Sequence, residues 1–127
     1  MSGFTVGKVS MRDIATGKLP EILRSKLSPE LIESAKTGNV GTIRRLLKMP
    51  GLDVNAVDSY GDTALIHAAG NGRVEVVKEL LGNEKVDVNA VDIHGDTALI
   101  RAARSGRVEV VKLILDKLGL EGIEITG

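Results

Sequence analysis

Histidine and aspartate are the residue types in this chain that could hold a metal ion or move a proton. There are only two histidines, His67 and His94, and no cysteine. A zinc site takes about four ligands from histidine, cysteine and carboxylate side chains. Two histidines without a thiolate therefore indicate surface side chains rather than a metal centre. We expect no bound metal and no cofactor.

The aspartates recur in pairs of identical spacing. Asp53 and Asp58 are followed 34 residues later by Asp87 and Asp92. Short polar side chains of this kind bind neighbouring backbone groups in loops, so we interpret all four as loop residues. The chain contains neither a Gly-x-Ser-x-Gly turn nor a phosphate-binding loop. The sequence therefore predicts a protein that is not an enzyme.

Composition excludes several classes of partner. The chain has 127 residues, of which 43% are hydrophobic and 2% aromatic, and 17 basic residues balance 17 acidic ones. With no net charge, no bulk field attracts nucleic acid or an anionic membrane, and no apolar run approaches the ~20 residues of a membrane span. The opening residues do not form a secretory signal. We expect a cytoplasmic or nuclear protein that is not secreted and binds neither nucleic acid nor membrane.

A repeat with a period of 34 residues organises the chain. Residues 61–78 read GDTALIHAAGNGRVEVVK, and residues 95–112 read GDTALIRAARSGRVEVVK. Shifting backwards by 34 finds a degenerate first copy, in which Leu31 aligns with Leu65 and Gly38 with Gly72. A fixed period of this length is typical of stacked repeat architectures.

Each unit is expected to contain two short helices. Thr63 is a good N-cap for a helix over 64–69, and Gly72 marks the end of that helix because glycine tolerates the left-handed cap conformation. The second helix, RVEVVKELL, places its apolar residues on one side and Glu75 and Lys78 on the other. Two such helices cannot bury both faces alone, but a stack of copies can.

These residues resemble the ankyrin repeat. The matching positions are Gly61, Thr63, Leu65, Ala68, Ala69, Gly72, Leu80, Leu81, Asp87, Val88, Asn89 and Ala90, and in the third copy Gly95, Thr97, Leu99, Ala102, Ala103 and Gly106. The resemblance implies an all-α solenoid of about three stacked helix-turn-helix units with β-turn loops. The family's histidine is replaced by Ile66 and Ile100, so we expect both to be buried between neighbouring inner helices.

We expect residues 1–27 to be an N-terminal extension that is flexible in part, with a helix near 19–27 covering the open edge of the first unit. The chain then restarts at Ser28-Pro29. The repeat domain spans 28–118, in units of about 28–57, 58–91 and 92–118, and 119–127 form a tail. The apolar residues Leu113, Leu118, Leu120, Ile123 and Ile125 near that end allow a folded-back tail, a self-association edge or further repeats.

The two copies differ where a stacked unit is free to vary. His67 becomes Arg101, Gly70 becomes Arg104 and Asn71 becomes Ser105. The resemblance implies that turn tips and inner helices line one concave binding face, so these differences indicate an individual surface on a copied scaffold. Arg101 and Arg104 make its third unit basic. The expected protein-binding residues are Ser59, Tyr60, Asp62, His67, Asn71, Ile93, His94, Asp96, Arg101, Arg104 and Ser105.

The resemblance also implies that Asn55 and Asn89 could be hydroxylated, although hydrogen bonding in the loop is the alternative. The expected function is protein–protein interaction without catalysis. Two alternatives stay open: an engineered or structural scaffold without a natural partner, and a non-catalytic regulatory subunit of a larger assembly. Near-identical units arise both from duplication and from engineering.

Overall fold

The computed structural model describes the backbone of residues 21–119 and the side chains of residues 26–119. The elements in this range are α2 (Glu21–Thr37), α3 (Val40–Leu47), α4 (Ala64–Gly70), α5 (Val74–Leu81), α6 (Ala98–Arg104) and α7 (Val108–Leu118). The β-pairing in it is one isolated bridge between Val57 and Thr63. The expected all-α class is confirmed.

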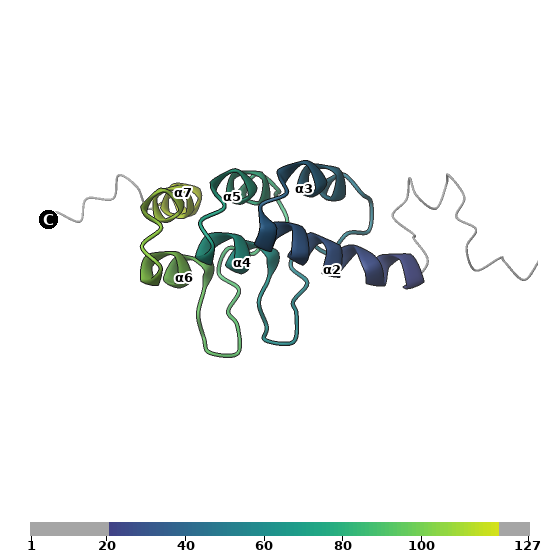
Figure 1. Ribbon diagram of the computed structural model, residues 1–127, viewed down its shortest axis with the longest axis horizontal. Coiled ribbons are helices and arrows are strands. Elements are labelled where there is room, and N and C mark those ends of the chain that lie inside the picture. The colour runs from purple at the N-terminus through teal and green to yellow at the C-terminus, as the bar shows by residue number, and fades with distance from the viewer. Residues whose placement is uncertain (1–20, 120–127) are drawn as a thin grey trace, which may run out of the picture.

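The helices form two rows (Figure 1). The inner row consists of α2, α4 and α6, and the outer row of α3, α5 and α7; neighbours within each row pack together. Each inner helix also packs on the outer helix of its own unit. Two long turns project below the inner row, and we call residues 57–63 the first finger and residues 91–97 the second finger. The predicted stack of three units is therefore confirmed.

Local sequence explains how each inner helix begins and ends. The hydroxyl oxygen of Thr63 accepts a hydrogen bond from the backbone N–H of Ile66 at 3.1 Å, and Thr97 caps α6 in the same way. This satisfies one of the backbone donors that a helix start leaves free. After α4, Gly72 takes a φ of +70°, which reverses the chain into α5. The predictions for Thr63 and Gly72 are confirmed.

Aliphatic side chains from all three units form one continuous core. In α5, Val76, Val77, Leu80 and Leu81 are buried, while Glu75 and Lys78 are exposed, as the helical spacing predicts. The largest fully buried side chains are Leu31, Ile43, Leu65, Ile66, Leu80, Ile114, Val76, Val77 and Val110. With almost no aromatic residues, the chain packs its core from Leu, Ile, Val and Ala.

The predicted restart at Ser28-Pro29 is wrong, because α2 runs without a break from Glu21 to Thr37 and contains Pro29. Proline removes one backbone donor and normally weakens a helix interior. Pro29 lies on the exposed side, however, where water can bind the carbonyl that loses its partner. Leu31 and Ala35, two and six residues after Pro29, are buried and anchor the helix against the stack.

The prediction that Ile66 and Ile100 are both buried holds only for the first of them. Ile66 is 1% exposed, because α6 packs over it. Ile100 is 40% exposed, because no further inner helix follows α6 in the described part of the chain. Isoleucine in place of the family's histidine therefore makes a buried apolar contact between α4 and α6, whereas Ile100 is partly exposed on α6.

The expected covering of the first unit is described only in part. Leu27 is half-buried and packs on the core, whereas Leu19, Ile22 and Leu23 lie outside the residues with described side chains. The expectations for residues 1–18 and for 120–127 likewise fall outside the described range. The unit limits 28–57, 58–91 and 92–118 stay predictions.

Candidate functional site

Each finger is folded around one aspartate. In the first finger, Oδ1 of Asp58 accepts the backbone N–H of Tyr60 at 2.9 Å and that of Asp62 at 3.0 Å. The second finger repeats the arrangement with Asp92, His94 and Asp96 at 2.8 and 3.0 Å. The predicted loop role of these aspartates is confirmed. Their carboxylates fix the shape of the turns that present the tips.

The fingers also touch each other. The backbone N–H of Ile93 donates to the carbonyl of Tyr60 at 3.0 Å. Close approach is possible because Gly61 has no side chain: a Cβ there would lie 3.0 Å from the nitrogen of Ile93. Since its φ is +78°, Gly61 is also favoured by the backbone. The two tips therefore form a single surface.

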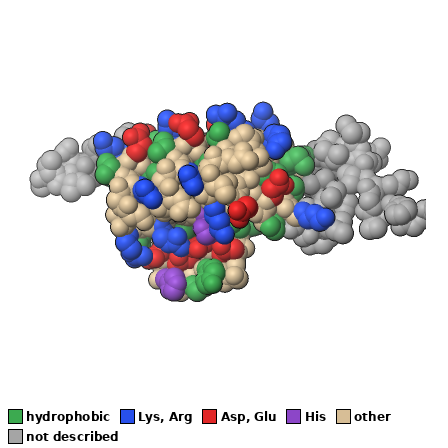
Figure 2. Space-filling model, viewed as in Figure 1, with side chains coloured by type: hydrophobic (Ala, Val, Ile, Leu, Met, Phe, Trp, Pro, Cys, Tyr) green, Lys and Arg blue, Asp and Glu red, His purple; other side chains and the backbone are tan. Residues whose placement is uncertain are grey.

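Four exposed hydrophobic side chains lie on the fingers. Val57 is 54% exposed, Tyr60 61%, Val91 53% and Ile93 64%. Tyr60 and Ile93 were predicted as presented residues, but sequence reasoning missed Val57 and Val91. Their signal was available, because both follow the loop motif Asp-Val-Asn-Ala at the same place in each unit. Figure 2 shows hydrophobic and histidine side chains at the finger tips, beneath a band of acidic side chains.

The eleven residues expected to bind a protein partner differ in their exposure. Ser59, Tyr60, Asn71, Ile93, His94, Arg104 and Ser105 are exposed, as expected. His67 and Arg101 are half-buried, and Asp62 and Asp96 are buried, so these four expected protein-binding residues are not freely presented at the surface. The carboxylates of Asp62 and Asp96 point into a polar network behind the fingers.

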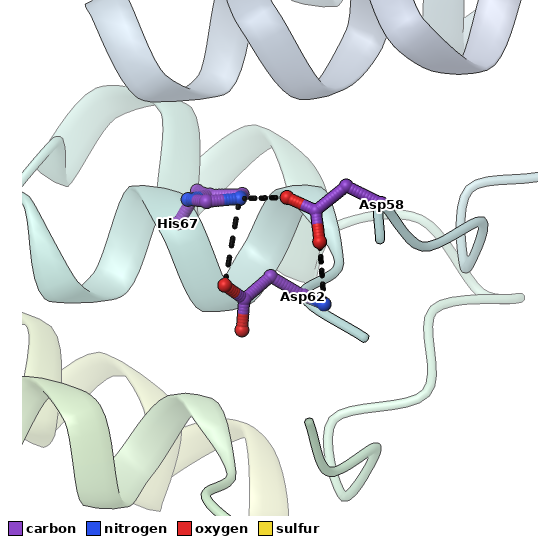
Figure 3. A group of neighbouring side chains, drawn as sticks. All are labelled: Asp58, Asp62 and His67. Carbon is purple, nitrogen blue, oxygen red and sulfur yellow. Dashed lines mark hydrogen bonds and ion pairs between the residues drawn. The ribbon is translucent and has the colours of Figure 1, made fainter. Parts of the chain in front are cut away.

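His67 connects the first finger to α4 (Figure 3). Its Nε2 lies 2.7 Å from Oδ2 of Asp58 and 3.7 Å from Oδ2 of Asp62. Only 15% of the His67 side chain is exposed, so the expectation of a surface histidine is wrong for this residue. Burial raises the pKa of Asp58, but the hydrogen bonds from His67 and two backbone N–H groups outweigh it and hold that pKa below its ordinary value.

Arg101 occupies the position of His67 one unit later and joins two units. Its Nη2 lies 2.6 Å from Oδ1 of Asp62 in the second unit and 3.0 Å from Oδ2 of Asp92 in its own unit. Burial raises the pKa of Asp62 despite this partner. Several hydrogen-bond donors hold the pKa of Asp92 well below its usual range, and the backbone N–H of Asp96 contributes most to this lowering.

Arg104 explains one difference between the copies. Asp62 obtains its arginine from the following unit, but Asp96 is in the last described unit. Arg104, which replaces Gly70, binds both oxygens of Asp96 at 2.8 and 3.1 Å. This hydrogen bonding lowers the pKa of Asp96. The third unit thus carries its own partner for the buried carboxylate.

The network corrects the expectation of a basic surface in the third unit. Arg101 and Arg104 are both paired with aspartates. The network holds four carboxylates against two guanidinium groups and one imidazole; the carboxylates belong to Asp58, Asp62, Asp92 and Asp96. The charge behind the fingers is therefore acidic in excess.

Asp58, Asp62 and His67 place three potential metal-binding atoms within 4.8 Å of one another. Each group already has a protein partner: Asp58 accepts three hydrogen bonds, two of them from backbone, and Asp62 accepts one from Arg101. Among the described residues, no buried polar side-chain atom lacks a partner. The arrangement therefore works as a hydrogen-bond network that holds the first finger on α4.

A second inter-unit contact was missed by sequence reasoning. The Nε of Arg73 donates to the carbonyl of Lys36 at 2.9 Å, and the Nε of Arg107 donates to the carbonyl of Gly70 at 3.1 Å. These pairs are related by the 34-residue period. Each arginine satisfies a carbonyl near the end of the preceding inner helix, where helices leave acceptors free. The sequence did carry a signal for these contacts, because Gly-Arg-Val-Glu occurs at the same place in the second and third units.

Asn55 bridges the outer loops of two units. Its Nδ2 donates to the carbonyl of Lys85 at 2.9 Å, and its Oδ1 accepts the backbone N–H of Asp87 at 2.7 Å. Asn89 is the equivalent residue and is exposed. Its backbone N–H donates to Asp87, while its side chain makes no hydrogen bond within residues 26–119. Of the two predicted hydroxylation sites, Asn55 therefore has both ends of its amide engaged.

The comparisons agree with this architecture. A family model described as ankyrin repeats in three copies matches residues 31–126. This match covers most of the sequence, and the chain belongs to the ankyrin repeat family. Ankyrin repeats are generally protein–protein interaction modules and generally non-catalytic. No curated protein matched the chain.

None of the helices in residues 21–119 has the length and hydropathy needed to span a bilayer.

Proposed function

We propose that the chain is a non-enzymatic module that binds a protein partner through its fingers and inner helices. The observation that carries this proposal is the set of four exposed hydrophobic side chains on the two fingers. Exposed apolar groups gathered at one place are typical of interaction sites. Tyr60 is the strongest candidate among them, because tyrosine is one of the residue types that contribute most of the binding energy when they anchor in a partner.

Rigidity supports the same proposal. Within each finger, the carboxylate of Asp58 or Asp92 accepts backbone hydrogen bonds. The backbone N–H of Ile93 donates to Tyr60 and joins the two fingers. His67 and Arg101 bind the same two aspartates from the inner helices. A surface that is already ordered loses little conformational entropy on binding. The fingers therefore meet the main requirement of a preformed recognition site.

A cavity beside the first finger can receive a partner's side chain. It measures about 270 Å³ and lies between α2 and the finger; its lining residues are Ser28, Pro29, Ile32, Glu33, Lys36, Val57 and Asp58. The lining combines the apolar side chains of Pro29, Ile32 and Val57 with the charged side chains of Glu33, Lys36 and Asp58. This chemistry fits a partner segment that places an apolar side chain next to a polar one. We propose that the interaction takes place in the cytoplasm or nucleus, a location with which the absence of cysteine is compatible.

Site-specific photo-crosslinking tests this proposal. A photoreactive phenylalanine derivative replaces Tyr60 in one variant and Glu75 in a matched control, since both positions are exposed but on opposite sides of the stack. We expect the Tyr60 variant to capture a defined protein from cell extract that the Glu75 variant does not. Capture from Glu75 alone would move recognition to the outer helices. Capture from neither position would favour the alternative of a scaffold without a natural partner.

A further inference from the structure

The two fingers are folded by the same hydrogen bonds. The backbone N–H of Gly61 donates to the carbonyl of Asp58 at 3.0 Å. In the second finger, the N–H of Gly95 donates to the carbonyl of Asp92 at 2.9 Å. Each of these aspartates also accepts two backbone N–H groups of its own finger through its carboxylate. Because the bonds are equivalent, backbone groups at equivalent positions of the two fingers point in the same direction relative to the stack.

One backbone hydrogen bond joins the fingers, and it shows which way one of these groups points. The N–H of Ile93 donates to the carbonyl of Tyr60 in the first finger. Ser59 has the place of Ile93 one unit earlier. The N–H of Ser59 therefore points away from the second finger, toward the end of the stack that holds α2 (Figure 1).

The first unit has a helix where the other two units have a finger. A shift of 34 residues aligns the first finger with residues 23–29, and all of these belong to α2. Ser59 is exposed, and its N–H donates no hydrogen bond to another residue within 26–119. We call the side of the first finger that faces away from the second finger its free edge. Backbone donors along such an edge are a template for pairing with another chain.

The cavity between α2 and the first finger lies at this free edge. Its volume is about 270 Å³, and its apolar lining comes from Pro29 and Ile32 of α2 and from Val57 of the finger. Val57 and Ser59 are two residues apart, so a segment bound to the N–H of Ser59 lies within reach of the cavity. Backbone hydrogen bonds along an edge, together with a pocket for a side chain, are the two features by which proteins bind an added strand.

The two copies differ at the residue that carries this donor. The first finger has Ser59 where the second finger has Ile93. In the second finger the N–H is already bound to Tyr60, and the bulky isoleucine side chain is 64% exposed. Serine is small and leaves the backbone beside it accessible. The difference between the copies therefore fits a free edge that receives another chain.

We propose that an extended segment of the protein partner adds to the free edge of the first finger, in the place that a preceding finger would have. A carbonyl of the segment accepts the N–H of Ser59, as Tyr60 accepts that of Ile93, and an apolar side chain enters the cavity beside Val57. The contact continues the interface that already joins the two fingers. This inference rests on the proposed function and specifies the form in which the partner is recognised.

The probes are synthetic overlapping peptides that cover the sequence of the protein captured through Tyr60. They are titrated calorimetrically into the full-length chain, and we expect one of them to bind. If the intact partner binds and none of its peptides does, the partner is not recognised as an extended segment and the proposal is wrong.

Ser59→Pro removes the N–H and keeps the turn. Ser59 follows Asp58, whose carbonyl accepts the N–H of Gly61, and proline is favoured at this second position of such a turn. We expect Ser59→Pro to weaken peptide binding at least about tenfold, whereas Ser59→Ala keeps the N–H and should leave the affinity within about twofold. Equal affinities of the two variants contradict the proposal. Weaker binding by Tyr60→Ala without any loss in Ser59→Pro contradicts it as well and leaves the proposed function intact.

Amide hydrogen exchange tests the same bond without a substitution. The bound peptide should slow exchange of the Ser59 N–H at least about tenfold, because a hydrogen-bonded amide exchanges only when the bond opens. The N–H of His94 is the control, since it is bound to Asp92 on the second finger in the free chain as well, and its exchange should change by less than about twofold. Unchanged exchange at Ser59 in the saturated complex overturns the proposal.

Two lysine variants separate the free edge from the rest of the finger surface. Val57 and Val91 occupy equivalent positions and are 54% and 53% exposed. The proposed function involves both, but Val57 lines the cavity at the free edge. We expect Val57→Lys to weaken peptide binding at least about fivefold more than Val91→Lys does. Equal losses, or a larger loss from Val91→Lys, would overturn the assignment to the free edge while still supporting recognition by the fingers.

Discussion

Ile66 and Ile100 occupy the same position in successive inner helices, yet 1% of Ile66 and 40% of Ile100 is exposed. The difference arises because α6 packs on α4, while the described part of the chain places no helix on the far side of α6. One residue type at one repeat position therefore has two energetic roles.

Truncation of the two isoleucines should separate those roles. Ile66→Ala removes buried methyl groups and leaves a cavity, so we expect the free energy of unfolding to fall by about 2–4 kcal/mol. Ile100→Ala should cost less than half as much, because its side chain already contacts water. Urea denaturation of both variants measures the difference, and equal losses would mean that Ile100 is also covered in solution.

Gly72 and Gly106 allow backbone strain to be separated from a steric contact. Their φ angles are +70° and +71°, so alanine at either should cost about 1–2 kcal/mol. At Gly72 the new Cβ would also lie 2.9 Å from Cδ of Arg107, whereas nothing lies within 4 Å at Gly106.

We therefore expect Gly72→Ala to be more destabilising than Gly106→Ala by about 1 kcal/mol, since displaced Arg107 loses its hydrogen bond to Gly70. Chemical denaturation measures both variants. In an Arg107→Ala background the extra cost should disappear; if it persists, Arg107 is not its source.

Asn55 and Asn89 form another matched pair. Asn55→Ala removes two inter-unit hydrogen bonds and is expected to lower the free energy of unfolding by about 1–2 kcal/mol. Asn89→Ala should change it by less than about 0.5 kcal/mol, as is usual for exposed side chains. Thermal and urea melts decide between them, and a larger effect at Asn89 would contradict the bridging role of Asn55.

Acid stability should depend on Asp92. Hydrogen bonds from Asp96 and His94 hold its pKa below the ordinary value of 3.8. A carboxyl whose pKa is lower in the folded state contributes stability that is fully present above the unfolded value and lost as pH falls through the folded value. We expect the free energy of unfolding to fall below about pH 4, and less steeply in Asp92→Asn.

Glu75→Gln is the control for removing a carboxylate, because Glu75 is exposed on the outer row and, within the described residues, its ion pair is with Lys78 three residues away. Denaturation between about pH 2.5 and pH 6 measures the slopes. An unchanged slope in Asp92→Asn, or an equal change in Glu75→Gln, would assign the acid sensitivity to other groups.

Local and periodic features were predictable from the sequence. The 34-residue period identified the units, Thr63 and Gly72 marked the limits of α4, and the spacing in α5 separated buried from exposed residues. Each of these features depends on neighbours within a few residues along the chain. The stack follows because such units can bury their apolar sides only against one another.

The polar network was not predictable in the same way. Asp62 and Arg101 are 39 residues apart, and their pairing depends on how closely two units approach. The sequence shows an arginine that replaces a histidine, but not that both side chains turn inward to meet turn aspartates. Ile100 was mispredicted for a related reason, since the repeat pattern does not show what lies beyond the last inner helix.

The central claim, that the fingers bind the partner, is tested most directly by measuring the affinity of the captured partner for two alanine variants. Tyr60→Ala removes an exposed aromatic anchor from the first finger and should weaken binding by about 30-fold or more, corresponding to a loss of about 2 kcal/mol. Glu75→Ala, on the outer row, should leave the affinity within about twofold. Calorimetric titration of both variants gives the answer. Loss of binding from Glu75→Ala with Tyr60→Ala unchanged would contradict the account and place recognition on the outer helices.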